Sequence, residues 1–432
     1  MELKKYKLGE LTQVTRGASL GGEYYATQGN YIRLTCGNFD YRNNCFKENQ
    51  SKDNIYYVGD FKEEFLLDKD DIITPLTEQA IGLLGSTARI PESGKYIQSQ
   101  DIAKIDCNES LLDKNFAFYL ISSACVKQQL SAAAQQTKIR HTSPDKIKDC
   151  TVWIPSLDVQ KRIGRILTDI DNKIAINRQI NDNLEAMAKQ LYDYWFVQFD
   201  FPNEEGKPYK SSGGAMVWNE KLKRKIPQGW SDCVLGDYIG RITNGLNPRK
   251  NFVLGSGNNY YVTIRSLVGT TIDWNNCDRC DDEALSKINS RSQLQIGDII
   301  FSTIGTIGRT YYILEEPTNW NISETSFTLR AKENVPNDFF YGMLRSNEIQ
   351  IKADKAAMGS TLRCLIMDSL CSLQYIKIPS YMMKLFSAKV SPLYRQIHRN
   401  NKEIAELTKQ RDELLPLLMN GQATVNYHLS DD

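Results

Sequence analysis

Side chains suited to recognition chemistry are spread through both halves of this sequence, in segments expected to be loops. Arg and Lys donate to phosphates and to guanine, whereas Asn and Gln pair with adenine, so such side chains are suited to reading nucleic acid. The candidates in the first half are Arg16, Arg33, Thr77, Gln79, Arg89, Lys138, Arg140 and His141. Those in the second half are Asn244, Asn247, Arg249, Lys250, Arg265, Thr303, Thr306, Arg309, Thr361 and Arg363. A solvated surface side chain is the competing interpretation for each one taken singly, so candidates at matching places in both halves are preferred.

Motifs for catalysis are missing from the sequence. It contains no GxxxxGK[ST] phosphate loop and no DPPY or NPPY of an adenine methyltransferase, and GSGNNY at 255–260 lacks the third glycine of a dinucleotide fingerprint. The histidines are His141, His398 and His428. Three scattered histidines make a poor basis for acid–base or nucleophilic catalysis. Cys277 and Cys280 form one CxxC without a second pair, which disfavours structural zinc. The sequence therefore predicts a non-catalytic chain without a metal or cofactor of its own.

Composition sets the broad class. The chain has 432 residues, of which 41% are hydrophobic and 24% are charged, as expected for two or three globular domains. No apolar run is long enough to cross a membrane, and the start MELKKYKLGELTQ has no apolar core of a secretory signal, so a cytoplasmic location is expected. Ten irregularly spaced cysteines are expected to be reduced thiols. The net charge of +1 leaves nucleic acid open as a partner.

Internal repeats indicate that the candidate loops belong to two similar units. The matching segments are KLGELTQVTRG (7–17) with VLGDYIGRITNG (234–245), DKDDIITPLT (68–77) with QIGDIIFSTI (295–304), and QTKIRHTSPDKIKDCTVWIPS (136–156) with STLRCLIMDSLCSLQYIKIPS (360–380). Coincidence among short words is the alternative. Several matches in one order at similar offsets favour a duplication, in which each half is a globular unit followed by a long helix.

The long helices are predicted from apolar spacing. Apolar residues recur every three or four positions from Ile163 to Leu191, and again from Phe386 to Leu418. A narrow apolar seam flanked by charge is buried best against a similar helix, which predicts an antiparallel coiled coil within the chain. Asn177 and Asn400 occupy equivalent seam positions, where a polar residue fixes register. Two ordinary amphipathic helices, each packed on its own domain, are the alternative.

The ends of these helices also carry signals. Each helix follows the word IPS, at 154–156 and 378–380, whose serine is suited to capping. Pro392 predicts a kink, or a restart of the second helix with Ser391 as its cap. The first helix ends in aromatic residues, which we expect to pack the helix end or to dock a partner subunit rather than to stack on bases. The docking candidates are Tyr194, Trp195, Phe196 and Phe199.

The predicted fold class is α+β, with two tandem-duplicated α/β domains separated by two long antiparallel helices under a pseudo-two-fold axis. The expected segments are domain 1 at 1–155, the first long helix at 156–199, a linker at 200–229, domain 2 at 230–379, the second long helix at 380–421 and a tail at 422–432. About forty helical residues span roughly 60 Å. Two heads held apart in this way suit two sites on one DNA duplex, whose major-groove faces recur about every 34 Å.

Longer segments of the sequence carry a family resemblance. LYDYWFVQFDFP (191–202), GKPYKSSGGAMVWNEKLKRKIPQGW (206–230), the paired IPS junctions and RDELLPLLMNGQATV (411–425) resemble the specificity subunit of type I restriction-modification systems, and the resemblance covers essentially the whole chain. It implies two target recognition domains, each of which reads one half of a bipartite asymmetric target in double-stranded DNA. It also implies that the helices set the unread spacer and dock two methyltransferase subunits.

The same resemblance implies a chain that is not itself catalytic and that joins restriction and translocase subunits in a larger complex. The partner subunits would use S-adenosylmethionine, ATP and Mg. Two other classes remain open at this point: a coiled-coil scaffold that binds no DNA, and a hydrolase of unfamiliar type.

Overall fold

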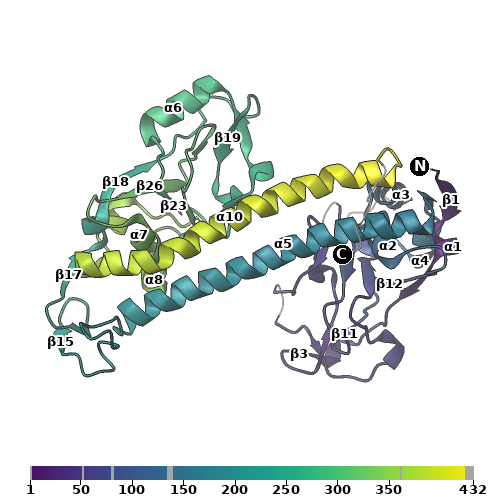
Figure 1. The fold of residues 1–432 in the computed structure, drawn as a ribbon, viewed down its shortest axis with the longest axis horizontal. Coiled ribbons are helices and arrows are strands. Elements are labelled where there is room, and N and C mark those ends of the chain that lie inside the picture. The colour runs from purple at the N-terminus through teal and green to yellow at the C-terminus, as the bar shows by residue number, and fades with distance from the viewer. Residues whose placement is uncertain (1, 51–52, 79–81, 134–139, 361, 424–432) are drawn as a thin grey trace, which may run out of the picture. The chain divides into compact units, whose positions relative to one another are not determined.

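The structure is a computed structural model that describes residues 2–50, 53–78, 82–133, 140–360 and 362–423 of the chain. Two compact units are present. The first comprises residues 1–175 and 405–432, and the second comprises residues 176–404. Helices α5 (Leu157–Tyr192) and α10 (Ser380–Met419) each begin in one unit and end in the other (Figure 1).

The first unit combines small, mostly antiparallel sheets with short helices. Its strands are β1 (Lys4–Lys7), β2 (Thr12–Arg16), β3 (Tyr25–Ala26), β4 (Tyr31–Arg33), β5 (Phe39–Asp40), β6 (Cys45–Phe46), β7 (Tyr56–Tyr57), β8 (Ile72–Pro75), β9 (Thr77–Glu78), β10 (Ala88–Arg89), β11 (Tyr96–Ile97), β12 (Ile102–Cys107), β13 (Arg140–His141) and β14 (Thr151–Ile154). Its shorter helices are α1 (Leu8–Leu11), α2 (Lys114–Ile121), α3 (Ala124–Ala133) and α4 (Pro144–Lys148). A four-stranded sheet in the order β10-β8-β12-β2 forms the centre, and both β8 and β12 are rich in buried isoleucine.

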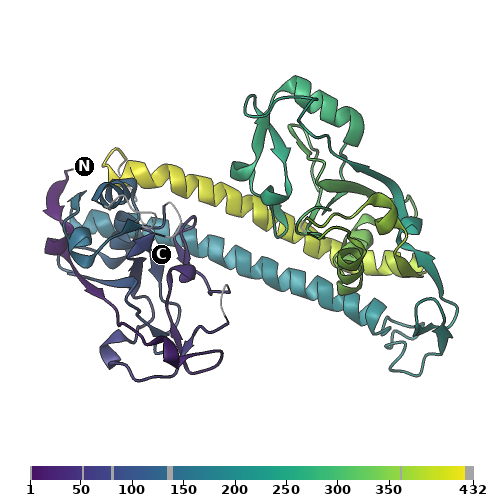
Figure 2. The same ribbon diagram turned by 180° about the vertical axis from the view of Figure 1, so that it is seen from behind.

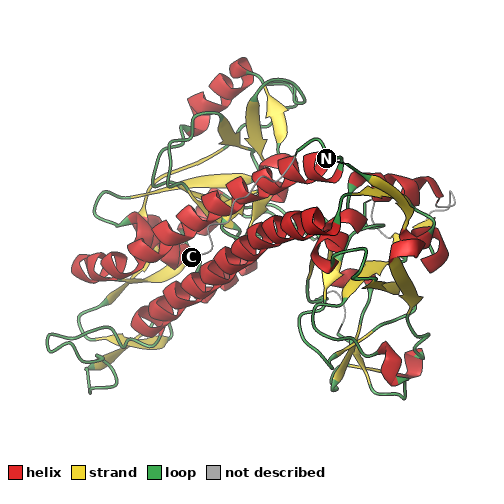
Figure 3. Cartoon of the chain, turned by 45° about the vertical axis from the view of Figure 1, so that its right-hand side comes forward, coloured by secondary structure: helices red, strands yellow, loops and turns green. Residues whose placement is uncertain are grey.

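The second unit has elements of the same kinds. Its strands are β15 (Met216–Asn219), β16 (Arg224–Pro227), β17 (Ser231–Val234), β18 (Ile239–Asn244), β19 (Asn259–Val262), β20 (Leu267–Val268), β21 (Thr271–Ile272), β22 (Asp278–Cys280), β23 (Ile299–Ser302), β24 (Thr310–Tyr312), β25 (Trp320–Ile322), β26 (Ser326–Ala331) and β27 (Gln374–Lys377). Its shorter helices are α6 (Asp282–Ser292), α7 (Asn337–Leu344), α8 (Asn347–Ala356) and α9 (Met367–Cys371). Figure 3 shows the strands of each unit in yellow beside its helices.

Topology confirms the duplication. The central sheet of the second unit has the order β24-β23-β26-β18, which matches β10-β8-β12-β2 strand for strand. A terminal antiparallel pair accompanies each sheet, β1 with β14 and β17 with β27. Each unit also has one parallel pair, β4 with β11 and β19 with β25. The units differ around this frame, because α6 follows β22 in the second unit whereas β7 and β3 extend the small sheet of the first.

The long helices pair in opposite directions within each unit, and both views show them side by side (Figures 1 and 2). In the first unit Arg411 contacts Asp171, and in the second unit Asn177 contacts Glu403. As the residue number on α5 increases, the residue number of its contact on α10 decreases. The predicted antiparallel pairing is therefore confirmed. The predicted restart at Ser391 is wrong, because α10 continues from Ser380 to Met419 without a break. Packing of Val390 and Tyr394 on both sides of Pro392 holds that helix in the core.

The segment 200–229, predicted to be a linker from its Gly, Ser and Pro content, is folded. Antiparallel β15 and β16 form a hairpin in it, and the Phe201 ring stacks on Trp230 with ring centroids 5.0 Å apart. Asp200 accepts hydrogen bonds from the Ser211 amide and hydroxyl, each at 2.7 Å. Turn-forming residues therefore build a compact structure here, because aromatic contacts that are distant in sequence hold the turns together.

Among the described residues, no helix combines the length and the apolar character that a membrane crossing requires.

Three buried cysteine thiols are expected to make the stability of the fold depend on pH in the alkaline range. Burial raises the pKa of Cys36, Cys150 and Cys233 to about 11, from an ordinary value of 9.0. The folded state keeps these thiols protonated while the unfolded chain loses their protons near pH 9. Their contribution to stability is therefore complete below about pH 9 and is lost as the pH rises to about 11.

Each thiol is expected to lower the free energy of unfolding by up to about 1.4 kcal/mol per pH unit in this window. Urea unfolding in reducing buffer between about pH 8 and pH 10 measures the slope. Cys150→Ala should make the slope shallower, and a Cys150→Ala slope equal to that of the native chain would contradict the assignment.

Candidate nucleic-acid interface

One edge of the central sheet gathers the candidate loops of the second unit. Because neighbouring strands run in opposite directions, β18 and β23 end at this edge and β26 begins there. The Thr303 amide and hydroxyl both donate to the Thr325 carbonyl, at 2.9 and 3.0 Å, which fixes the loop after β23 to the loop before β26. The Leu365 amide donates to the Thr303 carbonyl at 2.8 Å and attaches a third segment.

The equivalent edge of the first unit is built in the same way. The Thr142 amide donates to the Leu76 carbonyl at 2.8 Å, which is the counterpart of the bond between Leu365 and Thr303. β9 pairs with β13 at this edge. The Thr77 hydroxyl lies 3.3 Å from Asp101 Oδ1 and 3.3 Å from His141 Nδ1. Three separate segments are thus joined by hydrogen bonds at each edge, and in the first unit each of them contributes a polar side chain.

A glycine at the same place in both units allows these loops to approach. Gly17 follows β2 and Gly245 follows β18, and these glycines close the matched words TRG and TNG. A Cβ atom on Gly17 would overlap the backbone carbonyl of Gln98, and one on Gly245 would overlap that of Ile322. Backbone meets backbone at both positions, so only glycine fits. The sequence repeat therefore has a steric cause.

Several predicted residues lie at these edges, either in the strands that meet there or in the adjoining loops. They are Arg16, Thr77, Arg140 and His141 in the first unit, and Asn244, Asn247, Thr303, Thr306 and Arg363 in the second. Arg249 and Lys250 belong to the same loop as Asn247, and both are exposed. Gln79, Lys138 and Thr361 lie outside the described residues.

Some side chains at the edges already hold the loops in place. Asn244 accepts a hydrogen bond from Arg291 at 2.7 Å, and Arg363 donates to Asp354 at 2.7 Å. Thr303 is buried, with 2% of its surface exposed, so its hydroxyl supports the loop from within. Exposed Arg249 and Lys250 are therefore the better candidates for contacts with a ligand.

Two other predicted residues are engaged away from the edge of the first unit. Arg33 is 7% exposed, and its guanidinium stacks 3.8 Å above the centroid of the Tyr25 ring. This burial corrects its interpretation as a DNA contact. Arg89 donates to Asn115 at 2.9 Å and lies over the Phe118 ring. Both arginines stabilise the domain, because a guanidinium stacks on aromatic faces while its N–H groups donate at the rim.

Arg309 ends the loop between β23 and β24 that carries Thr303 and Thr306, whereas Arg265 lies just before β20, outside the edge loops. Arg309 Nη1 donates to the carbonyls of Ile264 and Leu267, at 3.1 and 3.0 Å. Arg265 is exposed, with Asp278 at 3.9 Å. Replacing Arg309 would therefore disturb the neighbouring loop as well as any contact with a ligand.

Acidic residues at both edges were missed, because the sequence search considered donors and amides only. Glu324 accepts from Asn247 Nδ2 at 2.6 Å and from the Tyr261 hydroxyl at 2.9 Å. Burial, and then the Glu324 carboxylate, raise the pKa of Tyr261. Asp101 occupies the corresponding loop of the first unit, just before β12. A carboxylate accepts a hydrogen bond from the amino group of cytosine. Acidic residues in the matched loops could therefore have indicated this part of the site from the sequence.

The predicted register residues lie at the interface of α5 and α10 in the second unit. Asn177 Nδ2 donates to Glu403 at 2.9 Å, and Asn400 Nδ2 donates to Asn181 Oδ1 at 2.8 Å. Asn181 in turn donates to Asn401 at 2.8 Å. Each asparagine thus pairs across the interface with a residue other than its own counterpart. Buried amides that find partners in one alignment only are suited to fixing register.

The aromatic docking candidates require a correction. Trp195, Phe196 and Phe199 are 5%, 1% and 3% exposed and belong to the core of the second unit. The Phe196 ring lies 5.2 Å from that of Phe386, centroid to centroid. Trp195 and Phe196 pack the helix end against α10 and, for Phe196, α7, whereas Phe199 packs against Trp230. Tyr194 alone of the four keeps a substantial exposed surface, 37%.

An exposed apolar stripe lies elsewhere on α5 and was also missed. Ile176, Ile180 and Met187 are 55%, 40% and 53% exposed, and Tyr194 follows seven residues after Met187. Spacings of four, seven and seven residues put these side chains on one face of a helix, beside the seam with α10. The equivalent positions of α10 include Arg399, Glu403 and Gln410, so the stripe belongs to α5. Such a face suits a helical partner.

Across the described part of the chain, no three His, Cys, Asp or Glu side chains are grouped so as to hold a metal ion. Cys280 is buried, and Cys277 Sγ lies 3.4 Å from the Asp273 carbonyl oxygen. The CxxC therefore belongs to the local fold of β22.

Comparison with known proteins connects this architecture to a family. Residues 1–186 match the type I restriction modification DNA specificity domain. The type I restriction enzyme MjaIX specificity subunit of Methanocaldococcus jannaschii is 26% identical over 317 residues, which cover 72% of this chain and 69% of that protein. The HindI specificity subunit of Haemophilus influenzae is 22% identical over 378 residues, covering 76% of this chain and 81% of that protein.

A solved structure shares the fold. The S subunit of a type I restriction-modification system from M. genitalium superposes with a TM-score of 0.60, covering 97% of this chain and 96% of that one at 16% identity. The duplicated frame, the antiparallel helices and the matched domain disfavour a scaffold that binds no DNA. The chain is similar to the specificity subunits of type I restriction-modification systems, in its first 186 residues by the family match and over most of its length by these relatives.

Proposed function

We propose that each domain reads one half of a bipartite, asymmetric DNA target through the loops at its sheet edge. The observation that carries this proposal is the pair of edges, which share hydrogen bonds and glycines but present different side chains. The common frame supports the same kind of contact in both units, while different side chains give each unit its own sequence preference. The long helices set the unread spacer between the two half-sites.

The chain is proposed to act without catalysis of its own, in the cytoplasm, together with two methyltransferase subunits and with restriction and translocase subunits. Those partners would use S-adenosylmethionine, ATP and Mg. Sequencing of adenine methylation, in cells that express the cognate methyltransferase with and without this chain, tests the proposal. Loss of one split motif on deletion is the expected result. An unchanged methylation map in the presence of an active methyltransferase would refute it.

The exposed pair on the edge loop of the second unit gives a direct test of DNA contact. Replacing both Arg249 and Lys250 with alanine should weaken binding of the assembled complex and lower the slope of log K against log salt by about two, because each phosphate contact releases about one counterion. Titrations of labelled cognate DNA at several salt concentrations measure this slope. Lys223→Ala, at an exposed turn of the β15–β16 hairpin, is the control. An unchanged slope would remove both residues from the interface.

The apolar stripe of α5 is proposed to dock a methyltransferase subunit. Glutamate at both Ile180 and Met187 should abolish co-purification with that subunit, because it places two charges on the apolar face. Urea unfolding of the chain alone should change little, since both side chains are exposed. Ala186→Glu adds a charge to another exposed face of α5 and should leave the complex intact. Normal assembly of the double variant would exclude the stripe as the docking surface.

A further inference from the structure

Each domain core is completed by a helix end that comes from the other half of the chain. The end of α10 buries Leu418 and Met419 in the core of the first unit. The end of α5 and the turn after it bury Trp195 and Phe196 in the core of the second unit. The two pairs are equivalent at an offset of 223 residues, the offset that also relates Asn177 to Asn400. We call the places that receive these ends the first seat, formed by α2 and the start of α5, and the second seat, formed by α7 and the start of α10.

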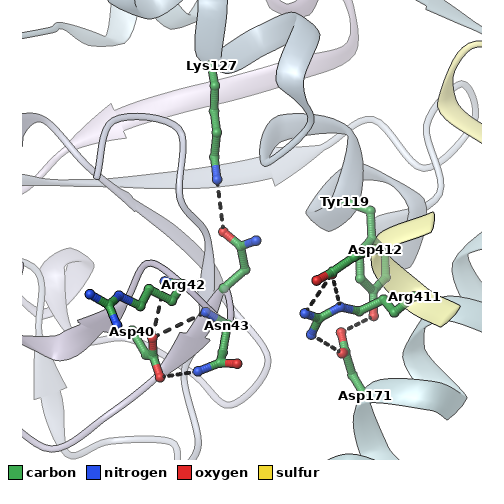
Figure 4. A network of polar contacts seen from close by, with 9 residues as sticks. Asp40, Arg42, Asn43, Tyr119, Lys127, Asp171, Arg411 and Asp412 are labelled. Carbon is green, nitrogen blue, oxygen red and sulfur yellow. Dashed lines mark hydrogen bonds and ion pairs between the residues drawn. The ribbon is translucent and has the colours of Figure 1, made fainter. Parts of the chain in front are cut away.

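The first seat carries an acidic residue and receives a basic one (Figure 4). Arg411 of α10 contacts Asp171 of α5 at 2.9 Å, and the Tyr119 hydroxyl of α2 donates to the other oxygen of Asp171 at 2.7 Å. The side chain of Arg411 is 8% exposed. Burial lowers the pKa of this guanidinium, but the carboxylates of Asp171 and Asp412 together raise it by more than burial lowers it. The pKa of Arg411 is therefore higher than usual.

The second seat has the opposite polarity. Here the seat supplies the base, Arg345 at the end of α7, and the arriving end of α5 supplies the acid, Glu185. Their contact is 2.6 Å, and the two side chains are 31% and 25% exposed. Arg345 also donates to the Tyr341 hydroxyl at 2.9 Å. The charge that each helix end brings is therefore reversed between the two seats.

The equivalent positions in the opposite seat have no such groups. Ala188 replaces Arg411 and is 3% exposed, and Thr408 replaces Glu185. Tyr394 replaces Asp171, and Gly342 replaces Tyr119; a Cβ on Gly342 would lie 3.1 Å from the Tyr394 hydroxyl. This packing leaves no space for an arginine beside Tyr394, and the Asp338 carboxylate of α7 already accepts from the Tyr312 and Ser387 hydroxyls, at 3.1 and 3.2 Å. In the first seat, Ser122 stands where the second has Arg345, and the Arg89 guanidinium over the Phe118 ring already donates to Asn115 at 2.9 Å.

We propose that these two ion pairs of reversed polarity form a pairing code. The first seat accepts the arginine-bearing end of α10, and the second seat accepts the glutamate-bearing end of α5. A second copy of either half is therefore rejected. Duplicated halves with equal seats would also pair with their own copies, as self-complementary surfaces do. A wrong helix end would strand partly buried charges without partners, which makes the code a barrier against like pairing. The code follows from the seats alone and does not depend on DNA recognition.

The test cuts the complete, folded protein once and then follows which halves stay together. A protease site replaces the exposed Glu204 and Glu205 in the turn between α5 and β15. The cut protein is mixed with an isotopically heavy copy, unfolded in urea, refolded and analysed by native mass spectrometry. Pairs of a light half with a heavy half show that exchange has taken place. Random pairing of equal amounts would give like pairs, meaning two N-terminal or two C-terminal halves, as half of the population.

With the native sequence, we expect unlike pairs almost exclusively. Neutralising both ion pairs of the code together (Asp171→Asn, Arg411→Met, Glu185→Gln and Arg345→Met) should raise the fraction of like pairs about tenfold or more. No wrong pairing then leaves a buried charge without a partner. Removing the exposed ion pair of α6 with Lys287→Ala and Glu283→Ala is the control, and it should leave the distribution unchanged.

A second variant keeps the test informative if the neutralised protein does not refold. Ala188→Arg gives the end of α5 the arginine that the first seat accepts, so pairs of two N-terminal halves should increase about tenfold relative to the native sequence. Like pairs in random proportion in the native protein would overturn the proposal. The proposal would also be overturned if the neutralised variant refolds and exchanges halves but still forms only unlike pairs. The same holds if the Ala188→Arg variant forms only unlike pairs.

Discussion

Replacing Arg411 with methionine is expected to destabilise the first unit by about 3 kcal/mol. The substitution keeps the apolar length of the side chain but leaves Asp171 without its cation. The Tyr119 hydroxyl then remains as a hydrogen-bond donor to that carboxylate, without a compensating positive charge from Arg411. Hydrogen exchange of α2 and β12 measures the loss, because these elements lie in the core that the end of α10 completes.

Two comparisons separate this effect from a general loss of charge. Lys207→Met removes an ion pair whose side chains are 65% and 70% exposed, and should change the stability by no more than about 0.5 kcal/mol. Combining Asp171→Leu with Arg411→Met should recover most of the lost stability, because no buried charge remains unpaired. If exchange protection of α2 is equal in Arg411→Met and Lys207→Met, the buried pair does not stabilise the unit.

Gly17→Ala is expected to abolish recognition of one half-site and, with it, methylation of the whole split target. The added methyl group overlaps the Gln98 carbonyl, so the loop that follows β2 must move away from the loop before β12. Overpacking of this kind costs about 1–3 kcal/mol, and the displaced loop directly follows Arg16, one of the candidate contacts of the first unit. Gly245→Ala should act in the same way on the second unit through the Ile322 carbonyl.

Methylation of cognate DNA by the assembled complex provides the measurement. Gly22→Ala is a matched control five residues from Gly17, since a Cβ there meets only the Tyr25 ring edge, at 3.9 Å. Assembly with the methyltransferase should persist in all three variants, because none of the glycines lies on the α5 stripe. Equal methylation by Gly17→Ala and Gly22→Ala would show that the two loops tolerate separation and do not form a reading surface.

Much of the architecture followed from the sequence because it rests on local periodicity and on repetition. The three-to-four spacing from Ile163 to Leu191 predicted a helix, and repeated words such as TRG and TNG predicted a second domain with the same frame. These signals are carried by residues close together in the chain, where backbone geometry dictates the spacing. The buried positions of Asn177 and Asn400 between the helices were predicted in the same way, since a polar residue interrupts an otherwise apolar seam.

Tertiary packing alone decided which side chains are available for binding. Trp195 and Arg33 have the composition of docking and DNA-contact residues, but α10 covers the former and Tyr25 stacks on the latter. Exposure depends on chain segments that are far apart in sequence, so no local pattern reports it.

The reversed charges of the two seats have the same origin. Asp171 and Arg411 are 240 residues apart, and Glu185 and Arg345 are 160 apart. Periodicity predicted that the two long helices would pair. Only the three-dimensional contacts show that one helix end carries the base and the other the acid, because an ion pair is defined by the distance between its atoms and not by the spacing of its residues in the chain.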